Sequence, residues 1–361
     1  MEKSQIKIIA AIAVVAIVVV AAAAVVVTMS DDGKDGTVTD GLGRVVKIES
    51  ANRVSTTSAT VAEIVCGLGG YSKLVGVTED TNPYKVNEYI MGIPNDGYPK
   101  SIVDGLNSGK LVNMGPMYMI TAESILLSNP GLVIMGGYFN KEETITQLED
   151  LGIPVVICKN DNSLENIYFN IRLIGKVLGK ESEAETLVKQ MESAIGKINS
   201  WVKSLNAPHK SVAVFMMYGS SYGTYANGDA YLMGTPMITM LGGTNAFGGK
   251  ITGMYEVVSM ESIIAANPDI MIDATPGSKA DLDSIKTNHL TKDLTAPKTN
   301  RIYGAFDTCN TAFTLTTQGF VNSVAIMAMF MYEDYLDFTI DHYMGDDYPD
   351  YLKKFWTQIN S

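Results

Sequence analysis

Short apolar runs alternate with amphipathic stretches along most of the chain. The apolar runs are typical of buried strands, and the stretches between them repeat apolar residues every three or four positions, as helices do. The predicted strands are 73–78, 132–137, 154–158, 211–217 and 269–274. Because strands and helices take turns, the pattern predicts an α/β fold with mostly parallel sheets covered on both faces.

The ends of several predicted helices can be located from capping residues. Ser58 or Thr57 is placed to cap one helix, and another begins near Ser163. Asn140, with Glu143 three residues later, is expected to open a third. An apolar tract at 311–338 reads as helical and is expected to pack across the C-terminal part of the fold.

The folded part is long enough for two lobes of ordinary size. It begins near a tight turn at DGLGR, residues 40–44, where glycine allows the chain to reverse. A long polar-rich stretch with Leu187, Met191, Ile195 and Ile198 on one stripe predicts a continuous helix. We therefore expect two Rossmann-like ligand-binding lobes joined by this helix, with the N-terminal lobe at 37–180, the connecting helix at 181–206 and the C-terminal lobe at 207–361.

An unbroken apolar run at 8–27 precedes the folded part. At 1.5 Å per residue, about 20 residues cross a hydrocarbon core of about 30 Å. Lys3 and Lys7 come before the run and acidic residues follow it, which favours a cytoplasmic N-terminus. We expect a signal-anchor or transmembrane helix at 1–29 and a linker at 30–36; a cleaved signal peptide is the main alternative. No cysteine follows the run where a bacterial lipoprotein is acylated.

Two segments repeat the same framework. TAESILLSNPGLVIM at 121–135 and SMESIIAANPDIMID at 259–273 share Glu-Ser-Ile, then Asn-Pro, then an apolar strand, 138 residues apart. Proline cannot continue a helix and favours extended geometry in its predecessor, so each copy predicts a helix, a stop and a strand. Each copy alone is also explained by an ordinary helix end, but the shared spacing favours two related lobes.

Composition excludes several classes of function. A net charge of -12 with no basic stripe argues against nucleic-acid binding. Cys66, Cys158 and Cys309 are an odd number, and no disulfide is predicted. The three histidines lie outside the predicted ligand loops, which argues against a bare metal site. The sequence contains no Walker loop and no ordered Ser-His-Asp set, so we do not expect an enzyme.

Several motifs together resemble one family. DGLGRVVKI, RVSTTSATVAEIVCGLGGYSKLVGVT, the two ESI–NP segments, QLEDLGIPVV, LGGTNAF and NRIYG are similar to the substrate-binding proteins of ABC importers for iron chelates and cobalamin, whose lobes are joined by one long helix. The resemblance implies an extracytoplasmic protein held at the cell membrane by a single-pass anchor. It would capture an iron chelate, siderophore or haem-like, between its lobes and deliver it to an ABC permease dimer and its ATPase.

The resemblance also leaves alternatives open. A corrinoid such as cobalamin is the alternative ligand, and a chelatase-like enzyme on the same bilobal scaffold is the alternative from another class. A surface receptor that has lost transport is a third. No cofactor is implied, since the metal chelate would be cargo. In the family, one exposed glutamate on each lobe docks against permease arginines, and Glu123 and Glu261 stand at those positions.

Ligands of open α/β sheets bind beyond the carboxyl ends of the strands, so the ligand loops are those that follow each strand. Tyrosine, which combines flat apolar area with a hydroxyl, is frequent there and suits a large planar ligand, although single tyrosines can also pack on a surface loop. Many siderophore-binding members of the family that the chain resembles use arginines in the second lobe to bind anionic chelates, and the segment FDTCNTAF at 306–313 has none. This departure favours a neutral or cationic chelate, a corrinoid or a haem-like ligand over a strongly anionic siderophore. The predicted ligand-binding residues are Thr57, Ser58, Tyr118, Tyr138, Tyr218, Tyr222, Tyr225, Tyr255 and Asp307.

Overall fold

The computed structural model describes residues 36–81, 89–93, 98–220, 223–274, 284–314 and 316–361. The predicted anchor at 1–29 and nearly all of the predicted linker lie outside these ranges. Within them, no helix combines the length and the apolar character that crossing a bilayer requires. Residues 38–361 form one compact unit.

The first sheet has five strands in the order β5-β4-β3-β6-β7, and every neighbouring pair is parallel. Its strands are short apolar segments, as the sequence predicts: β3 (Val54–Thr56), β4 (Leu74–Val77), β5 (Val112–Asn113), β6 (Leu132–Met135) and β7 (Val155–Ile157). Its helices and 3-10 turns are α2 (Ala59–Gly67), η2 (Tyr71–Lys73), η3 (Glu79–Thr81), α3 (Tyr98–Asn107), η5 (Met117–Met119), α4 (Ala122–Leu126), α5 (Glu142–Asp150) and α6 (Leu164–Leu178).

The predicted helix caps are mostly confirmed. Ser58 accepts a hydrogen bond from the Val61 amide at 3.3 Å and caps α2, and Ser163 accepts one from Asn166 at 3.2 Å and caps α6. The prediction for Asn140 is wrong, because α5 starts after Lys141. Instead, Asn140 donates its side-chain amide to the Gly137 carbonyl at 2.7 Å and belongs to the preceding loop.

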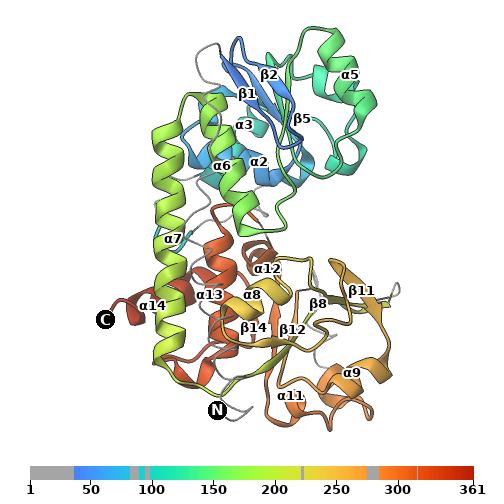
Figure 1. Cartoon of the computed structure of the whole chain (residues 1–361), viewed down its shortest axis with the longest axis vertical. Coiled ribbons are helices and arrows are strands. Elements are labelled where there is room, and N and C mark those ends of the chain that lie inside the picture. Colours follow the sequence, from blue (N-terminus) through green and yellow to red (C-terminus); the bar gives the residue numbers. More distant parts are fainter. Residues whose placement is uncertain (1–35, 82–88, 94–97, 221–222, 275–283, 315) are drawn as a thin grey trace, which may run out of the picture. The chain divides into compact units, whose positions relative to one another are not determined.

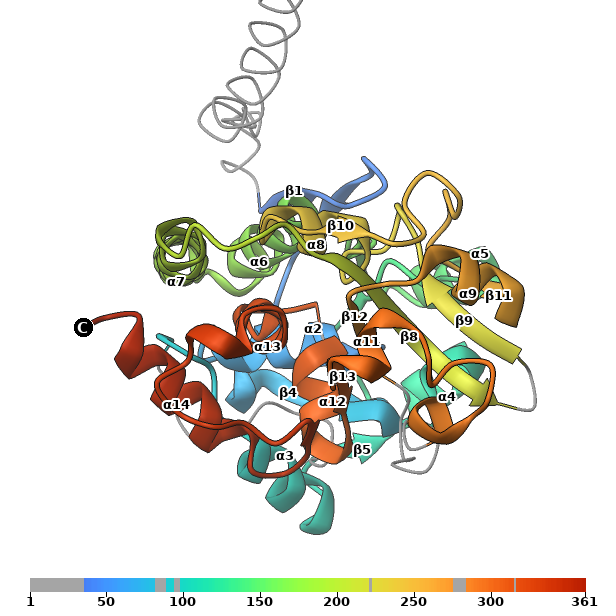
Figure 2. The ribbon, with the colours of Figure 1, turned by 90° about the horizontal axis from the view of Figure 1, so that it is seen from below.

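Helix α7 (Glu181–Ser204) is continuous over 24 residues and runs beside both sheets (Figure 1). It packs on α6 from the first half and on α13 from the second half, and Figure 2 shows α6 and α7 side by side. The stripe of Leu187, Met191, Ile195 and Ile198 is buried along its length. A single stiff helix therefore carries the chain from one sheet to the other.

The second sheet has seven strands. It runs β11-β9-β8-β12-β13-β14, with β10 paired to β8, and it is mixed because β9 is antiparallel to both β8 and β11. The strands are β8 (Ser211–Ser220), β9 (Gly223–Asn227), β10 (Thr244–Asn245), β11 (Tyr255–Val258), β12 (Ile270–Asp273), β13 (Ile302–Ala305) and β14 (Tyr343–Met344). The helices are α8 (Thr235–Met240), α9 (Met260–Ala266), α11 (Thr295–Lys298), α12 (Asp307–Thr314), α13 (Phe320–Met331), η6 (Glu333–Tyr335) and α14 (Tyr348–Gln358). The short hairpin of β1 (Thr37–Thr39) and β2 (Val45–Lys47) confirms the predicted turn at 40–44.

The predicted helical tract at 311–338 is broken, and this prediction is wrong as a single helix. Helix α12 ends at Thr314 and α13 begins at Phe320. Between them, Gln318 donates its side-chain amide to the Glu63 carbonyl of α2 at 2.9 Å. The polar residues of the tract therefore form a loop that contacts the first half of the fold, and α13 shows no amphipathic stripe because all of its residues are buried.

The two sheets share an inner core. The largest cluster of buried apolar residues runs from Val54 in β3 through Val188 in α7 and Val324 in α13 to Val212 in β8. Two smaller clusters lie around β6 and β7 and around β12 and β13. The α/β architecture with two sheets joined by a long helix is therefore confirmed, but the two halves also rest on each other through α13.

The repeated segments fold alike, with one difference from expectation. Thr121 and Ser259 cap α4 and α9 by accepting the amides of the third residue along, at 3.3 and 3.2 Å. Asn129 and Asn267, which precede proline, have φ of 48° and 38°. The predicted extended geometry at these asparagines is wrong, because asparagine tolerates the left-handed region, where it ends a helix.

Candidate functional site

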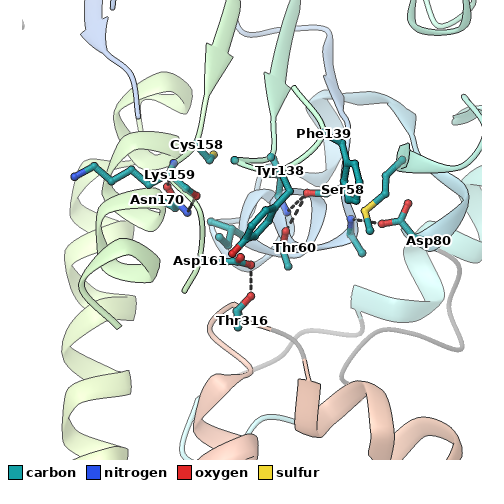
Figure 3. A pocket seen from close by; sticks show the side chains of 16 residues that line it. Ser58, Thr60, Asp80, Tyr138, Phe139, Cys158, Lys159, Asp161, Asn170 and Thr316 are labelled. Carbon is teal, nitrogen blue, oxygen red and sulfur yellow. Dashed lines mark hydrogen bonds between the residues drawn. The ribbon is translucent and has the colours of Figure 1, made fainter. Parts of the chain in front are cut away.

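A cavity of about 160 Å³ lies where the loops at the carboxyl ends of the first sheet meet the loop between α12 and α13. Its walls are formed by the start of α2 and by the loops after β4, β5, β6 and β7, and Thr316 comes from the second half of the chain (Figure 3). Its polar lining includes the side chains of Ser58, Asp80, Tyr138, Lys159, Asp161 and Thr316.

The amino end of α2 forms one wall. Ser58, Ala59, Thr60 and Val61 all line the cavity. The free amides of a helix start attract anions, but here two of them, those of Ala59 and Val61, already donate to this chain's own oxygens. The Asp80 carboxylate accepts from the Ala59 amide at 3.0 Å, while Ser58 accepts from Val61. The other carboxylate oxygen of Asp80 is buried without a hydrogen-bond partner among the described residues.

The loop after β7 brings Asp161 to the cavity. Asn170 of α6 fixes this loop, because it accepts from the Lys159 amide at 2.8 Å and donates to the Lys159 carbonyl at 2.9 Å. Gly137 allows the close approach: a Cβ there would lie 2.4 Å from the Asn160 nitrogen. The side chain of Lys159 turns away from the cavity (Figure 3), with its ammonium 4.2 Å from the centroid of the Phe169 ring.

Asp161 joins the two halves of the chain. The Thr316 hydroxyl donates a hydrogen bond to the Asp161 carboxylate (Figure 3). Burial raises the pKa of Asp161, while the bond from Thr316 and a backbone amide oppose that rise by stabilising the ionised form. A carboxylate that is desolvated and incompletely paired favours a positively charged or hydrogen-bond-donating neighbour.

Tyrosines from both halves lie near this carboxylate. Burial, followed by the charges of Asp161 and Tyr255, raises the pKa of Tyr138 to about 12. Burial and the same neighbours raise the pKa of Tyr231 as well. The Tyr255 ring packs edge-on against Tyr225 and Tyr231, with centroids 6.1 and 6.2 Å apart. The phenols of Tyr138 and Tyr231 are therefore protonated at neutral pH and act as hydrogen-bond donors and apolar surface.

The predicted ligand residues of the first half lie in or near the cavity. Ser58 and Tyr138 line it. Thr57 is buried behind it, where its hydroxyl accepts from the Gly136 amide at 3.2 Å and spaces two ligand loops. Tyr118 is exposed in η5, one residue from Met117, which lines the cavity.

The predicted ligand-binding residues of the second half are not among the described residues that line the cavity. Tyr225 and Tyr255 belong to the tyrosine group beside the cavity, and Asp307 is exposed at the start of α12, outside the cavity lining. Tyr218 falls in β8, but its side chain, like the whole of Tyr222, lies outside the described residues.

Sequence reasoning missed four residues of this site. Asp161 follows a predicted strand, so the rule that ligand loops follow strands points to it, and Asp80 lies in the equivalent loop after β4. Tyr231 lies in the same tyrosine-rich stretch as the predicted residues Tyr218, Tyr222 and Tyr225. Thr316 carried no signal, because the tract around it reads as helix.

Glu123 and Glu261 occupy matching positions away from the cavity. Both are exposed in the first turn of their helices, α4 and α9. Backbone hydrogen bonds, and then the capping hydroxyls of Thr121 and Ser259, lower the pKa of each carboxyl. Both are therefore ionised at neutral pH, and each has an exposed apolar neighbour on its own helix, Leu127 or Ile264.

Metal and thiol chemistry find little support in the described part of the chain. There, no three His, Cys, Asp or Glu side chains converge as a metal site would require. All three cysteines are free, and burial raises the pKa of the Cys158 thiol beside the cavity. A buried thiol of raised pKa is a poor nucleophile.

Comparison with known proteins is consistent with this architecture. An uncharacterized ABC transporter substrate-binding lipoprotein of Bacillus subtilis (strain 168), YvrC, is 27% identical over 243 residues, which are 67% of this chain and 68% of that protein. A periplasmic solute binding protein of Veillonella parvula DSM 2008 superposes with a TM-score of 0.63 at 24% identity, covering 90% of this chain and 92% of its own.

A second solved structure is the periplasmic heme-binding protein RhuT of Roseiflexus sp. RS-1 in its apo form. It superposes with a TM-score of 0.61 at 23% identity, covering 79% of this chain and 99% of its own, and at this identity it supports the fold alone. The model of the family described as periplasmic binding protein matches residues 54–307. The family expected from the sequence motifs is confirmed, and the chain belongs to the periplasmic binding proteins.

Proposed function

We propose that the chain is the substrate-binding component of an ABC importer that captures a metal chelate, siderophore or haem-like, and delivers it to a permease. The observation that carries this proposal is the cavity built by ligand loops of the first sheet and closed by Thr316 from the second half. RhuT and HutB of Vibrio cholerae, which share the fold, are described as periplasmic heme-binding proteins. A corrinoid is the alternative ligand.

The lobes of this proposal are residues 37–180 and 207–361, with 181–206 as the connecting helix. A cavity of about 160 Å³ is smaller than the roughly 300–1,000 Å³ of typical ligand pockets. A chelate therefore requires the lobes to move apart at the Asp161–Thr316 contact. Because α7 is continuous and packs on both α6 and α13, we expect a small opening rather than a wide hinge motion.

Glu123 and Glu261 would dock the loaded protein on the permease. Two exposed carboxylates on equivalent helices suit a permease dimer that presents two equivalent basic pockets. The lowered pKa of both carboxyls keeps them charged for this purpose.

The folded part would work outside the cytoplasm, held at the membrane by the apolar segment at 8–27. The Bacillus subtilis relative is described as a lipoprotein. An acyl anchor needs a cysteine shortly after the apolar segment, and the first cysteine of this chain is Cys66, inside α2. A single-pass helical anchor therefore fits this sequence better.

No catalytic step is proposed. The cavity holds carboxylates and protonated phenols, without an activated nucleophile among the described residues. The competing chelatase reading predicts steady conversion of a tetrapyrrole by the purified chain, whereas capture predicts binding at fixed stoichiometry without product.

The test of delivery is the double variant Glu123→Ala, Glu261→Ala. It is expected to bind the chelate as tightly as the wild type, because both residues lie away from the cavity, and to lose uptake in cells that carry the permease and ATPase. Glu142→Ala with Glu143→Ala, which removes two exposed first-turn carboxylates from α5, is the matched control and should transport normally. Normal uptake by the first double variant would remove the docking assignment.

A further inference from the structure

We propose that the carboxylates of Asp161 and Asp80 select a positively charged solute, so that the cargo is a cationic chelate rather than an anionic one. This inference rests on the proposed function and names the class of its substrate. It concerns the residues of this chain's own cavity, where Asp161 carries most of the effect.

The charges that face the cavity are unbalanced. Among the described lining residues, the side chains of Asp, Glu, Lys or Arg type are Asp80, Lys159 and Asp161. The Lys159 ammonium lies over the Phe169 ring and points out of the cavity in Figure 3. Asp161 and Asp80 both line the cavity, Asp80 with one oxygen bonded to the Ala59 amide, and the described lining residues include no arginine.

Two amides of the helix start at the cavity are already bonded within the chain. The start of α2 directs its amides toward the cavity, but Asp80 and Ser58 accept from the Ala59 and Val61 amides. An anionic chelate would have to displace the Asp80 carboxylate from this helix end and then lie beside it. A cationic chelate can leave both bonds in place.

The two carboxylates are held differently. One oxygen of Asp80 is buried without a hydrogen-bond partner among the described residues. Asp161 receives the Thr316 hydroxyl, a neutral donor, and burial raises its pKa. A buried carboxylate gains most from a cation, because both desolvation and its incomplete pairing are then compensated.

The neighbouring tyrosines favour the same class. The charge of Asp161 helps to raise the pKa of Tyr138 to about 12, so that a phenolate there is disfavoured. Protonated phenol rings offer their faces to cations and their hydroxyls to polar ligand edges. The described lining therefore combines two acidic side chains with aromatic surface, while its one lysine, Lys159, directs its ammonium away.

Matched pairs of chelates that differ only in charge provide the test. Full-length chain in detergent micelles is titrated calorimetrically with ferrioxamine B, a ferric trihydroxamate with a free ammonium group, and with its neutral N-acetyl derivative. The aquacyano and dicyano forms of cobinamide give a cationic and a neutral corrinoid, and haemin and a ferric tris-catecholate supply anionic chelates. The inference predicts that, for each scaffold that binds, the cationic member binds at least about tenfold more tightly than the neutral one, or about 1.4 kcal/mol.

Three variants separate charge from shape. Asp161→Asn keeps the size and the ability to accept from Thr316, and it should reduce the charge preference to within about threefold. Thr316→Val removes the hydrogen bond from Thr316 to Asp161 without changing charge, and it should affect both members of a pair equally. Asp150→Asn removes an exposed carboxylate at the end of α5 and should leave every affinity unchanged.

The outcomes separate this inference from the function on which it rests. Equal affinity within a pair, tightest binding of an anionic chelate, or a preference that survives in Asp161→Asn overturns charge selection while chelate binding stands. No binding of any chelate overturns the proposed function and the inference together. The ratio of the affinities for the cationic and the neutral chelate is measured on the wild-type protein. It therefore tests charge selection even if a variant fails to fold.

Discussion

The two copies of the internal repeat begin alike, but different hydrogen bonds stabilise the ends of their helices. In the first copy, Arg53 donates to the carbonyls of Asn129 and Ser128, at 2.7 and 2.9 Å, and holds the end of α4 from outside. In the second copy, the side chain of Asn267 itself accepts from the Thr295 amide at 2.8 Å and ties α9 to α11. The same turn is thus stabilised by a distant arginine in one lobe and by its own asparagine in the other.

The lobes also differ in what they bring to the cavity. The first, with its all-parallel sheet, supplies the start of α2 and the carboxylates of Asp80 and Asp161. The second carries the antiparallel strands β9 and β11, from which Tyr225 and Tyr255 extend beside it. A shared frame that places Glu123 and Glu261 at equivalent helix starts is therefore combined with unlike loops around the cavity.

The largest stability difference between the copies is expected at the two asparagines. Asn267→Ala should lower the free energy of unfolding by about 2 kcal/mol, because alanine is disfavoured in the left-handed region and the bond to Thr295 is lost. Asn129→Ala should cost only about 1 kcal/mol, since the hydrogen bonds of Asn129 within the described residues involve its backbone. Guanidinium unfolding of the full-length chain measures both changes.

Glycine separates the two contributions at Asn267. Asn267→Gly retains the backbone conformation and loses only the side-chain bond. Its free energy of unfolding should therefore fall by about half as much as that of Asn267→Ala. Equal losses of unfolding free energy in Asn267→Ala and Asn129→Ala would show that the bond to Thr295 adds no stability. The proposed difference between the two helix ends would then be wrong.

A smaller effect is expected when the outside fastening of the first copy is removed. Arg53→Ala should cost about 1.5 kcal/mol, because two charge-assisted hydrogen bonds to carbonyls are lost at a partly exposed site. Arg172→Ala is the matched control: it breaks the exposed Arg172–Glu185 pair at 2.6 Å and should cost under about 1 kcal/mol. Thermal unfolding of both variants gives the comparison, and a smaller loss at Arg53 than at Arg172 would contradict it.

Local patterns in the sequence were sufficient for much of the fold. The strands, the caps Ser58 and Ser163, and helix α7 follow from apolar periodicity and short-range hydrogen bonds, which act within a few residues. The break between α12 and α13 did not follow. It depends on contacts of Thr316 and Gln318 with Asp161 and Glu63, which are remote in sequence, and local periodicity contains no trace of them.

The candidate site was predictable only in outline. The rule for strand ends led to Ser58 and Tyr138, which line the cavity, and applied to every strand it would also have reached Asp161. Tyrosine density indicated the right segment, yet which tyrosine lies near the carboxylate depends on the pairing of β9 with β11 and on the meeting of the two lobes. That meeting is a tertiary property, and no spacing in the sequence encodes it.

The smallest predicted effect is a shift in the titration of Tyr138. The pKa of Tyr138 is raised from 10.0 to about 12, first by burial and then by the charge of Asp161. The folded chain thus keeps a proton that the unfolded chain releases above pH 10, so the stability linked to this proton is present below pH 10 and is lost as the pH rises toward about 12.

In Asp161→Asn the charge disappears and the burial remains, so Tyr138 should ionise at a lower pH than in the wild type but still above 10. The ultraviolet absorbance of phenolate reports this, with Tyr138→Phe in each background identifying the contribution of the one residue. An unchanged midpoint would mean that the lobe-one carboxylate does not reach the aromatic part of the cavity. The acidic side chains from the first lobe and the tyrosines around the cavity would then not influence each other electrostatically, and their arrangement would not affect a bound solute in this way.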